Sequence, residues 1–203
     1  MSKVIRISLA DISKLNFTEY FSPVFNNYYN KYFDMSAGQE HYRLLSYLST
    51  QFTGENILDI GTSDGHSALA LSYNKLNKVH SFDIVNLINS EKVQSLSNVN
   101  YYLENLWDGA IRTKCTEFIK SCPLIFLDVD PHEGDMEIDF YRFLKSINYQ
   151  GMMVCDDVHH FEGMRNKFWS KIPSEEKYDL TKYGHWSGTG VICFNTEIKI
   201  ELL

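Results

Sequence analysis

Short apolar runs that alternate with segments of helical periodicity constrain the fold of this chain more than any single motif. Runs of this length are typical of buried strands, and apolar residues spaced three or four apart indicate the helices between them. Strands that alternate with helices imply right-handed crossovers and a mostly parallel, doubly wound α/β sheet. Two further runs near the C-terminus would bring this sheet to seven strands. The predicted strands are residues 56–60, 79–83, 99–103, 124–127, 151–155, 178–181 and 190–194.

Acidic residues stand at or just after the ends of four of these runs. In a doubly wound sheet, ligands bind at the carboxyl ends of the strands. The positions of the acids therefore predict a polar site along one edge of the sheet. These acids are Asp59, Asp83, Asp128, Asp156 and Asp157.

Residues 56–71 predict a strand, a glycine-containing turn and a helix. Gly61 and Gly65 permit positive φ and the close approach of a ligand, and the free N–H groups of the following helix point to the same place. Asp83 ends the next predicted strand 22 residues after Gly61, a spacing that suits a carboxylate binding a ribose diol. Together these features predict a nucleoside-containing cofactor.

The same turn permits two other interpretations. Residues 61–65 match the G-x-S-x-G elbow of α/β-hydrolases, with Ser63 as nucleophile and Asp156 and His185 following in hydrolase order. That fold needs earlier strands and an oxyanion loop, and neither is visible in the sequence. A dinucleotide fingerprint fits less well, because Ser63 and His66 replace its second and third glycines and would crowd a pyrophosphate.

Length and charge limit the class of protein. A chain of 203 residues favours a single domain, residues 1–203, with a core at 53–203 and a helical or irregular N-terminal lid at 1–52 that includes an aromatic run at 25–33. The 26 acidic residues outnumber 19 Lys and Arg, which disfavours nucleic acid as a partner. No apolar run approaches the roughly 20 residues that span a bilayer, and no signal peptide is visible. We therefore expect a cytoplasmic protein that has no membrane partner.

Residues 55–71 resemble the first motif of class I S-adenosylmethionine-dependent methyltransferases, and Asp83 is similar to the ribose-binding acid of their second strand. The resemblance continues from about residue 53 to the C-terminus as an order of elements, and it implies the Rossmann-like methyltransferase fold. It also implies S-adenosylmethionine as the cofactor. The residues implied to surround its methionine end are Asp59, Gly61, Ser63 and Gly65, with Ser67 close by, and those near its adenine are Asn105 and Leu106.

Residues 126–128 and 155–157 are similar to the metal-binding positions of cation-dependent O-methyltransferases of the catechol and caffeoyl-CoA type. The metal ligands that this resemblance implies are Asp128, Asp156 and Asp157, the last of which replaces the usual Asn. Independently of any family, carboxylates that meet from adjacent strand ends repel one another unless a cation or a proton neutralises them. Oxygen ligands favour Mg²⁺, with Mn²⁺ or Ca²⁺ as alternatives, over zinc.

Two other readings of these acids stay open. Asp156 and Asp157 could instead cap the helix that follows them, a common position for Asp. His159 and His160 could turn the cluster into an iron site, although neighbouring histidines on a loop are more often surface residues.

The catalytic base of the resembled family is missing, because Pro131 occupies the position of its Lys. Asp130 and His132 resemble an Asp-x-Asp-His segment of small-molecule and sugar O-methyltransferases, with His132 displaced by one position. An imidazole titrates near neutral pH, so we expect His132 to accept the proton, with His159 as the second candidate. Asp128 completes the predicted catalytic set as a ligand of the ion.

The predicted function is the transfer of a methyl group from S-adenosylmethionine to a hydroxyl of a small-molecule acceptor, assisted by a divalent cation. The alternatives are a Ser63 hydrolase and a noncatalytic cofactor-binding protein of the same fold. The acceptor cannot be read from the sequence, because the lid and loops that choose it are the least patterned segments. Trp186 could face an aromatic or sugar acceptor, or lie in the core.

Overall fold

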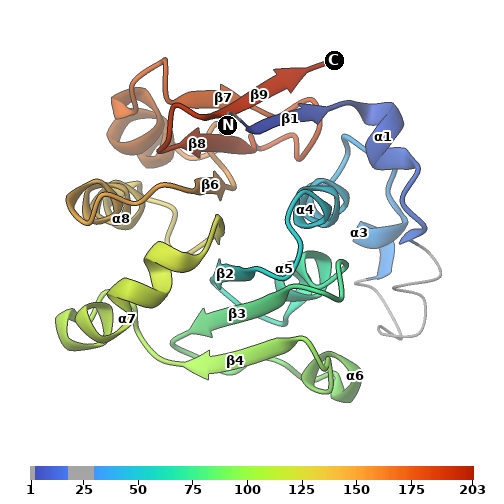
Figure 1. Ribbon diagram of the computed structural model, residues 1–203, viewed down its shortest axis with the longest axis horizontal. Coiled ribbons are helices and arrows are strands. Elements are labelled where there is room, and N and C mark those ends of the chain that lie inside the picture. The colour runs from blue at the N-terminus through green and yellow to red at the C-terminus, as the bar shows by residue number, and fades with distance from the viewer. Residues whose placement is uncertain (1–2, 18–29) are drawn as a thin grey trace.

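The computed structural model describes residues 3–17 and 30–203 and places a seven-stranded sheet at its centre (Figure 1). The strands lie in the order β4-β3-β2-β5-β6-β8-β7, and β8 alone runs antiparallel to its neighbours β6 and β7. The expected doubly wound, mostly parallel sheet is confirmed. Its strands are β2 (Asn56–Ile60), β3 (Lys78–Asp83), β4 (Val99–Leu103), β5 (Leu124–Leu127), β6 (Met152–Cys155), β7 (Lys177–Asp179) and β8 (Gly190–Cys193).

Helices cover both faces of this sheet (Figure 1). Successive residues of a strand point to opposite faces, so Ile57 packs with the helices on one side and Leu58 with those on the other. The first side carries α4 (His41–Thr50) and α5 (His66–Leu71), and the second carries α7 (Gly109–Ser121) and α8 (Asp135–Ser146). The remaining helical segments of the core are the short helix α6 (Glu91–Gln94), the π-helix η1 (Met164–Phe168) and the 3₁₀ turn η2 (Trp169–Lys171).

The apolar faces of α4 and α8 pack in the core, although Phe143 of α8 is only partly buried. In α4 the side chains of Leu44, Leu45 and Leu48 are fully buried, and in α8 those of Phe140 and Leu144 are. Burial of one apolar stripe against the sheet stabilises such helices more than intrinsic propensity does. No helix within residues 3–17 and 30–203 is long and apolar enough to cross a membrane.

The N-terminal segment differs in part from the expected helical or irregular lid. Its described residues include the short helices α1 (Leu9–Ser13) and α3 (Asn30–Asp34) as well as α4, but Lys3–Ile7 forms the strand β1. This strand pairs in parallel with β9 (Ile198–Leu202), and the pair makes a second, two-stranded sheet. Residues 18–29, which hold most of the predicted aromatic run, lie outside the described residues.

Candidate active site

The turn after β2 brings the end of this strand against the end of β5. Gly61 has φ +97°, and a Cβ atom at this position would lie 1.6 Å from the carbonyl oxygen of Asp128. The N–H of Asp128 in turn donates to the carbonyl of Ile60 at 2.9 Å. Glycine at position 61 is therefore required both by the backbone conformation and by the contact with β5.

Asp83, at the end of β3, is fixed by the same turn. One carboxylate oxygen accepts the N–H of Ser63 at 2.8 Å, and the other accepts the N–H of Val85 at 3.0 Å. Ser63 adopts φ +47°, an uncommon conformation for a residue with a side chain. The carboxylate is thus oriented by two backbone donors before any ligand binds.

Asp59 lies behind the turn and is completely buried. Its Oδ2 accepts the hydroxyl of Ser81 at 2.5 Å, whereas its Oδ1 has no hydrogen-bond partner among the described residues. Burial raises the pKa of Asp59 to about 7, and hydrogen bonds from Ser81 and Ser67 act against this rise.

A cavity of about 410 Å³ opens beside Asp83 and extends to the end of β5. Its lining includes seven of the predicted site residues. They are Gly61, Ser63, Asp83, Asn105, Leu106, Asp128 and His132.

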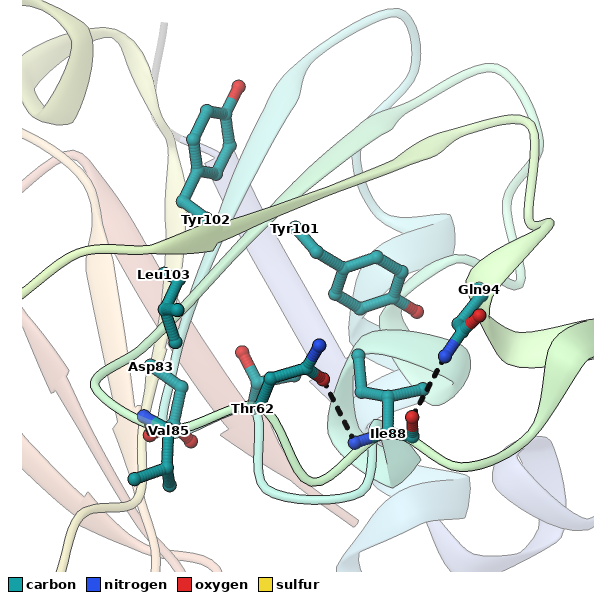
Figure 2. A pocket seen from close by; sticks show the side chains of 9 residues that line it. Thr62, Asp83, Val85, Ile88, Gln94, Tyr101, Tyr102 and Leu103 are labelled. Atoms are coloured by element: carbon teal, nitrogen blue, oxygen red, sulfur yellow. Dashed lines mark hydrogen bonds between the residues drawn. The ribbon is translucent and has the colours of Figure 1, made fainter.

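Three residues expected around the cofactor do not line that cavity. Asp59 and Ser67 are buried behind it, and Gly65 faces α6, because a Cβ there would lie 2.5 Å from Val93. A second cavity of about 240 Å³ shares Asp83 and Val85 with the first and extends toward Tyr101 (Figure 2).

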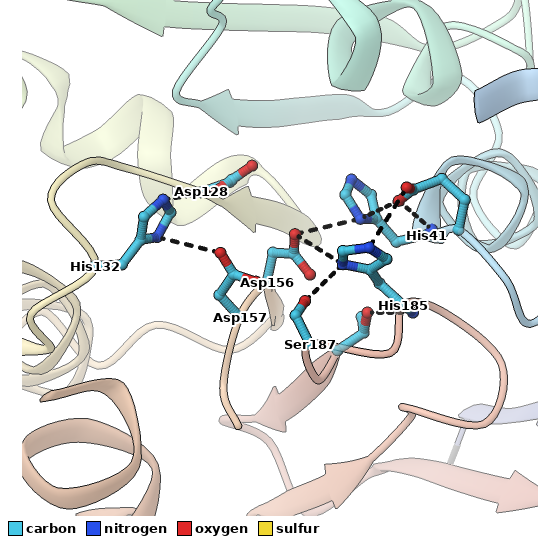
Figure 3. Close-up of polar contacts among 9 residues, drawn as sticks. His41, Asp128, His132, Asp156, Asp157, His185 and Ser187 are labelled. Carbon is cyan, nitrogen blue, oxygen red and sulfur yellow. Dashed lines mark hydrogen bonds and ion pairs between the residues drawn. The ribbon is translucent and has the colours of Figure 1, made fainter. Parts of the chain in front are cut away.

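The three predicted metal ligands come from the ends of β5 and β6 (Figure 3). His132 lies between two of them, with Nε2 3.9 Å from Asp128 Oδ1 and Nδ1 3.8 Å from Asp157 Oδ2. Burial raises the pKa values of Asp128 and Asp156 above the usual aspartate range. Repulsion adds to the rise, from Asp156 on Asp128 and from Asp157 on Asp156. Ligand atoms of Asp156, Asp157 and His185 lie within 4.8 Å of one another, a group that does not include Asp128.

Neither a protein-family model nor a curated protein sequence matches this chain. Solved structures do match. The cofactor-bound protein Rv0187 from MTB gives a TM-score of 0.53 at 13% identity, over 75% of this chain and 79% of that one. A candidate caffeoyl-CoA O-methyltransferase from Staphylococcus aureus gives a TM-score of 0.52 at 14% identity, over 87% of this chain and 88% of that one. A candidate SAM-dependent methyltransferase from Streptococcus mutans gives a TM-score of 0.50 at 8% identity, over 74% of this chain and 48% of that one.

These similarities, the sheet order and the glycine turn all indicate the same fold. The fold is that of the class I S-adenosylmethionine-dependent methyltransferases. In this methyltransferase fold, the 410 Å³ cavity lies at the carboxyl ends of β2, β3 and β5, the edge at which doubly wound sheets bind their ligands.

The helix-capping alternative for Asp156 and Asp157 is wrong. The helical segment that follows β6 includes η1, which begins at Met164, and its N-cap residue Gly163 has no side-chain cap bond. Asp157 instead adopts φ +58° in the loop directly after β6. Neither acid therefore caps that segment, and a ligand atom of each lies within 4.8 Å of one from His185.

The two loop histidines are not gathered with these acids. His159 Nε2 lies 2.8 Å from Asp179 Oδ2, and His160 packs edge-on against Trp186, whose side chain is 68% exposed. Among the described residues, neither histidine belongs to a group of ligand atoms close enough to share a metal ion. The geometry favours His132, which lines the cavity, over His159 as the base.

The hydrolase alternative is not favoured by the contacts of its proposed residues. Ser63 donates its backbone N–H to Asp83, while His185 Nδ1 forms a hydrogen bond with Ser187 Oγ at 2.5 Å. No described contact joins Ser63 to His185.

Glu40 and His41, at the start of α4, were not predicted as site residues. His41 is buried, and its Nδ1 lies 3.3 Å from Asp156 Oδ2. Glu40 lies 2.8 Å from the same nitrogen. Burial lowers the pKa of His41, but the carboxylates of Asp156 and Glu40 raise it more, to about 9. The one available signal was an ionisable side chain on an otherwise apolar helix face.

Proposed function

We propose that this protein transfers the methyl group of S-adenosylmethionine to a hydroxyl oxygen of a small molecule, with the help of a divalent cation. The observation that supports this most directly is the continuity of one cavity. Asp83, suited to a ribose, lines one part of it, and Asp128 and His132, suited to an acceptor hydroxyl, line another.

The chain fits S-adenosylmethionine. The cavity volume of about 410 Å³ lies within the usual range for small-molecule sites. The carboxylate of Asp83 is held by two backbone donors, and Asn105 and Leu106 lie in the same lining. The glycine turn lets a ligand approach the backbone closely. When bound, the cofactor supplies a methyl group on a positively charged sulfur, which is already activated for displacement.

Replacing Asp83 with alanine should weaken S-adenosylmethionine binding by about 1.5–3 kcal/mol, the range for hydrogen bonds made by a charged acceptor. Isothermal titration calorimetry measures the change. Asp139→Ala is the matched control, because Asp139 is an exposed acid that pairs with Arg112 and lies outside both cavities. Equal affinity in Asp83→Ala and the wild type would remove Asp83 from the cofactor site.

The acids at the ends of β5 and β6 fit a divalent cation. Asp156 Oδ1 is buried without a hydrogen-bond partner among the described residues, and the neighbouring carboxylates repel one another. Mg²⁺ is the first choice for such oxygen ligands, with Mn²⁺ or Ca²⁺ next. When bound to Asp128, Asp156 and Asp157, the ion would lower the pKa of an acceptor hydroxyl and fix its position.

His132 is placed to receive the proton of the acceptor. It lines the cavity, lies 3.9 Å from Asp128 and stacks on Phe161 with ring centroids 5.0 Å apart. The stacked ring and the flanking acids hold the imidazole in place. The acceptor is proposed to be a small molecule, because the net charge of −7 disfavours a polyanion.

His132→Asn should lower the rate of methyl transfer by about 10²–10⁴-fold, the usual contribution of general base catalysis. Asn is chosen because His132 has φ +56°, a conformation that Asn tolerates better than Gln. The matched control is His159→Asn, which changes a histidine bonded to Asp179 instead. Rates and pH profiles that are unchanged in His132→Asn would exclude this residue as the base.

The cofactor assignment can be tested directly by mass spectrometry of the small molecules released when the purified protein is denatured. S-adenosylmethionine or its demethylated product is expected. Cofactor binding without turnover over a broad acceptor panel would instead support the noncatalytic alternative.

A further inference from the structure

A second group of ionisable residues adjoins the acids of the proposed catalytic site and joins three separate segments (Figure 3). Glu40 and His41 stand at the start of α4, Asp156 follows β6, and His185 lies in the connection between β7 and β8. The ligand atoms of Glu40, His41 and His185 lie within 4.8 Å of one another. Asp156 Oδ2 lies 3.3 Å from Nδ1 of His41 and 3.9 Å from Nδ1 of His185.

The buried nitrogens of His41 lack hydrogen bonds. The residue is only 4% exposed, and neither Nδ1 nor Nε2 has a hydrogen-bond partner among the described residues. Nδ1 nevertheless lies 2.8 Å from Glu40 Oε1 and 3.3 Å from Asp156 Oδ2, so it faces both carboxylates. Nδ1 thus faces the centre of the group, where a proton or a metal ion can lie between the imidazole and the two carboxylates.

His185 is oriented as metal-binding histidines commonly are. Its Nδ1 forms a hydrogen bond with the hydroxyl of Ser187 at 2.5 Å, and Ser187 is only 2% exposed. When Nδ1–H donates to this hydroxyl, Nε2 keeps a free lone pair directed toward Glu40, 3.6 Å away. A bond from the second ring nitrogen to an oxygen fixes the tautomer that a metal ion needs.

We propose that Glu40, His41, Asp156 and His185 bind a Zn²⁺ ion. Two imidazoles and two carboxylates form a mixed nitrogen and oxygen set, which suits zinc better than magnesium. Four ligands about 2.0–2.1 Å from a tetrahedral zinc are about 3.3–3.4 Å apart. The contacts of Glu40 with His41 Nδ1 and His185 Nε2, and of Asp156 with His41 Nδ1, span 2.8 to 3.6 Å, close to that spacing.

This ion is distinct from the proposed catalytic cation and does not depend on it. The two sites share Asp156 alone, whose Oδ2 faces the histidines while its Oδ1 has no hydrogen-bond partner among the described residues. The zinc ion would connect α4 of the N-terminal segment to β6 and to the loop before β8. Its main effect is therefore on the stability of this junction rather than on the methyl transfer itself.

Zinc titration of tag-free, chelator-treated protein tests the proposal, with isothermal titration calorimetry and the thermal unfolding midpoint as readouts. We expect one equivalent of Zn²⁺ to bind and to raise the midpoint. His185→Gln should weaken binding at least about 100-fold, beyond the roughly 10- to 100-fold effect of an outer-shell change such as Ser187→Ala. His159→Gln is the matched control and should bind zinc as the wild type does.

Asp128→Asn separates this site from the proposed catalytic one, because Asp128 does not belong to the zinc group and should leave zinc affinity unchanged. His41→Gln provides a second test of the ligand set. Should it fail to fold, His185→Gln, whose side chain is 19% exposed, decides the question. Absence of zinc binding in the wild type would overturn the proposal. So would binding that is lost in Asp128→Asn and retained in His185→Gln.

Discussion

Replacing Gly61 with alanine is expected to lower the free energy of unfolding by about 2–5 kcal/mol. Overpacking costs about 1–3 kcal/mol, and a side chain at positive φ costs about 1–2 kcal/mol more. Here the new Cβ would lie 1.6 Å from the backbone carbonyl of Asp128, and no rotamer change can relieve a clash with backbone. Urea unfolding followed by circular dichroism measures the loss. S-adenosylmethionine binding should fall with it, because the same turn lines the cavity.

Gly54→Ala is the matched control for this experiment. Gly54 also has a positive φ, +76°, but a Cβ there would meet no atom within 4 Å. It should therefore show only the conformational cost, about 1–2 kcal/mol. The difference between the two variants isolates the contact between β2 and β5. If both variants lose the same stability, the close approach of the two strand ends does not contribute to the fold.

Removing the acids of the proposed catalytic ion should reduce methyl transfer at least about 100-fold, because a bound cation supplies several kcal/mol of charge stabilisation. Asp128→Asn and Asp157→Asn are the variants of choice. Asparagine keeps the shape of aspartate, and it tolerates the φ of +58° at position 157. Initial rates with an identified acceptor measure the loss, while the unfolding midpoint and the affinity for S-adenosylmethionine should change little.

Treatment with EDTA should have the same effect on the wild type, and added Mg²⁺ or Mn²⁺ should restore the rate. Asp139→Asn is the control for charge, since it removes an exposed acid whose surface ion pair is worth little. Full activity in the metal-free enzyme would exclude the dependence on a cation and leave methyl transfer without it.

The central sheet could be predicted from the sequence because each strand is a short apolar run flanked by turns and helices. The run at β5, with every residue buried, is the clearest example. Strands β1 and β9 were missed for a physical reason. Each has five residues, and they pair with each other from distant parts of the chain, so neither is part of a local βα repeat.

The sequence predicted site residues best where they lie at or near the end of a strand. Gly61, Asp83 and Asp128 follow strands directly, and all three line one cavity. His41 and His185 are brought to Asp156 by the packing of α4 and by the loop before β8. The position of His41 in the helix is that of an ordinary buried residue, so the local sequence does not show which acid its ring meets. Tertiary packing determines which histidine meets which acid.

The pairing of β1 with β9 has a consequence for how this protein is made. The strand partner of β1 among the described residues, 198–202, is made nearly two hundred residues after β1 itself. Domains tend to fold as the chain emerges, so the central sheet can assemble while β1 still lacks its partner. Ile5 and Ile7 then pack with Leu44 of α4 in the finished core. The N-terminal segment can therefore complete its packing over α4 only after residues 198–202 have been made.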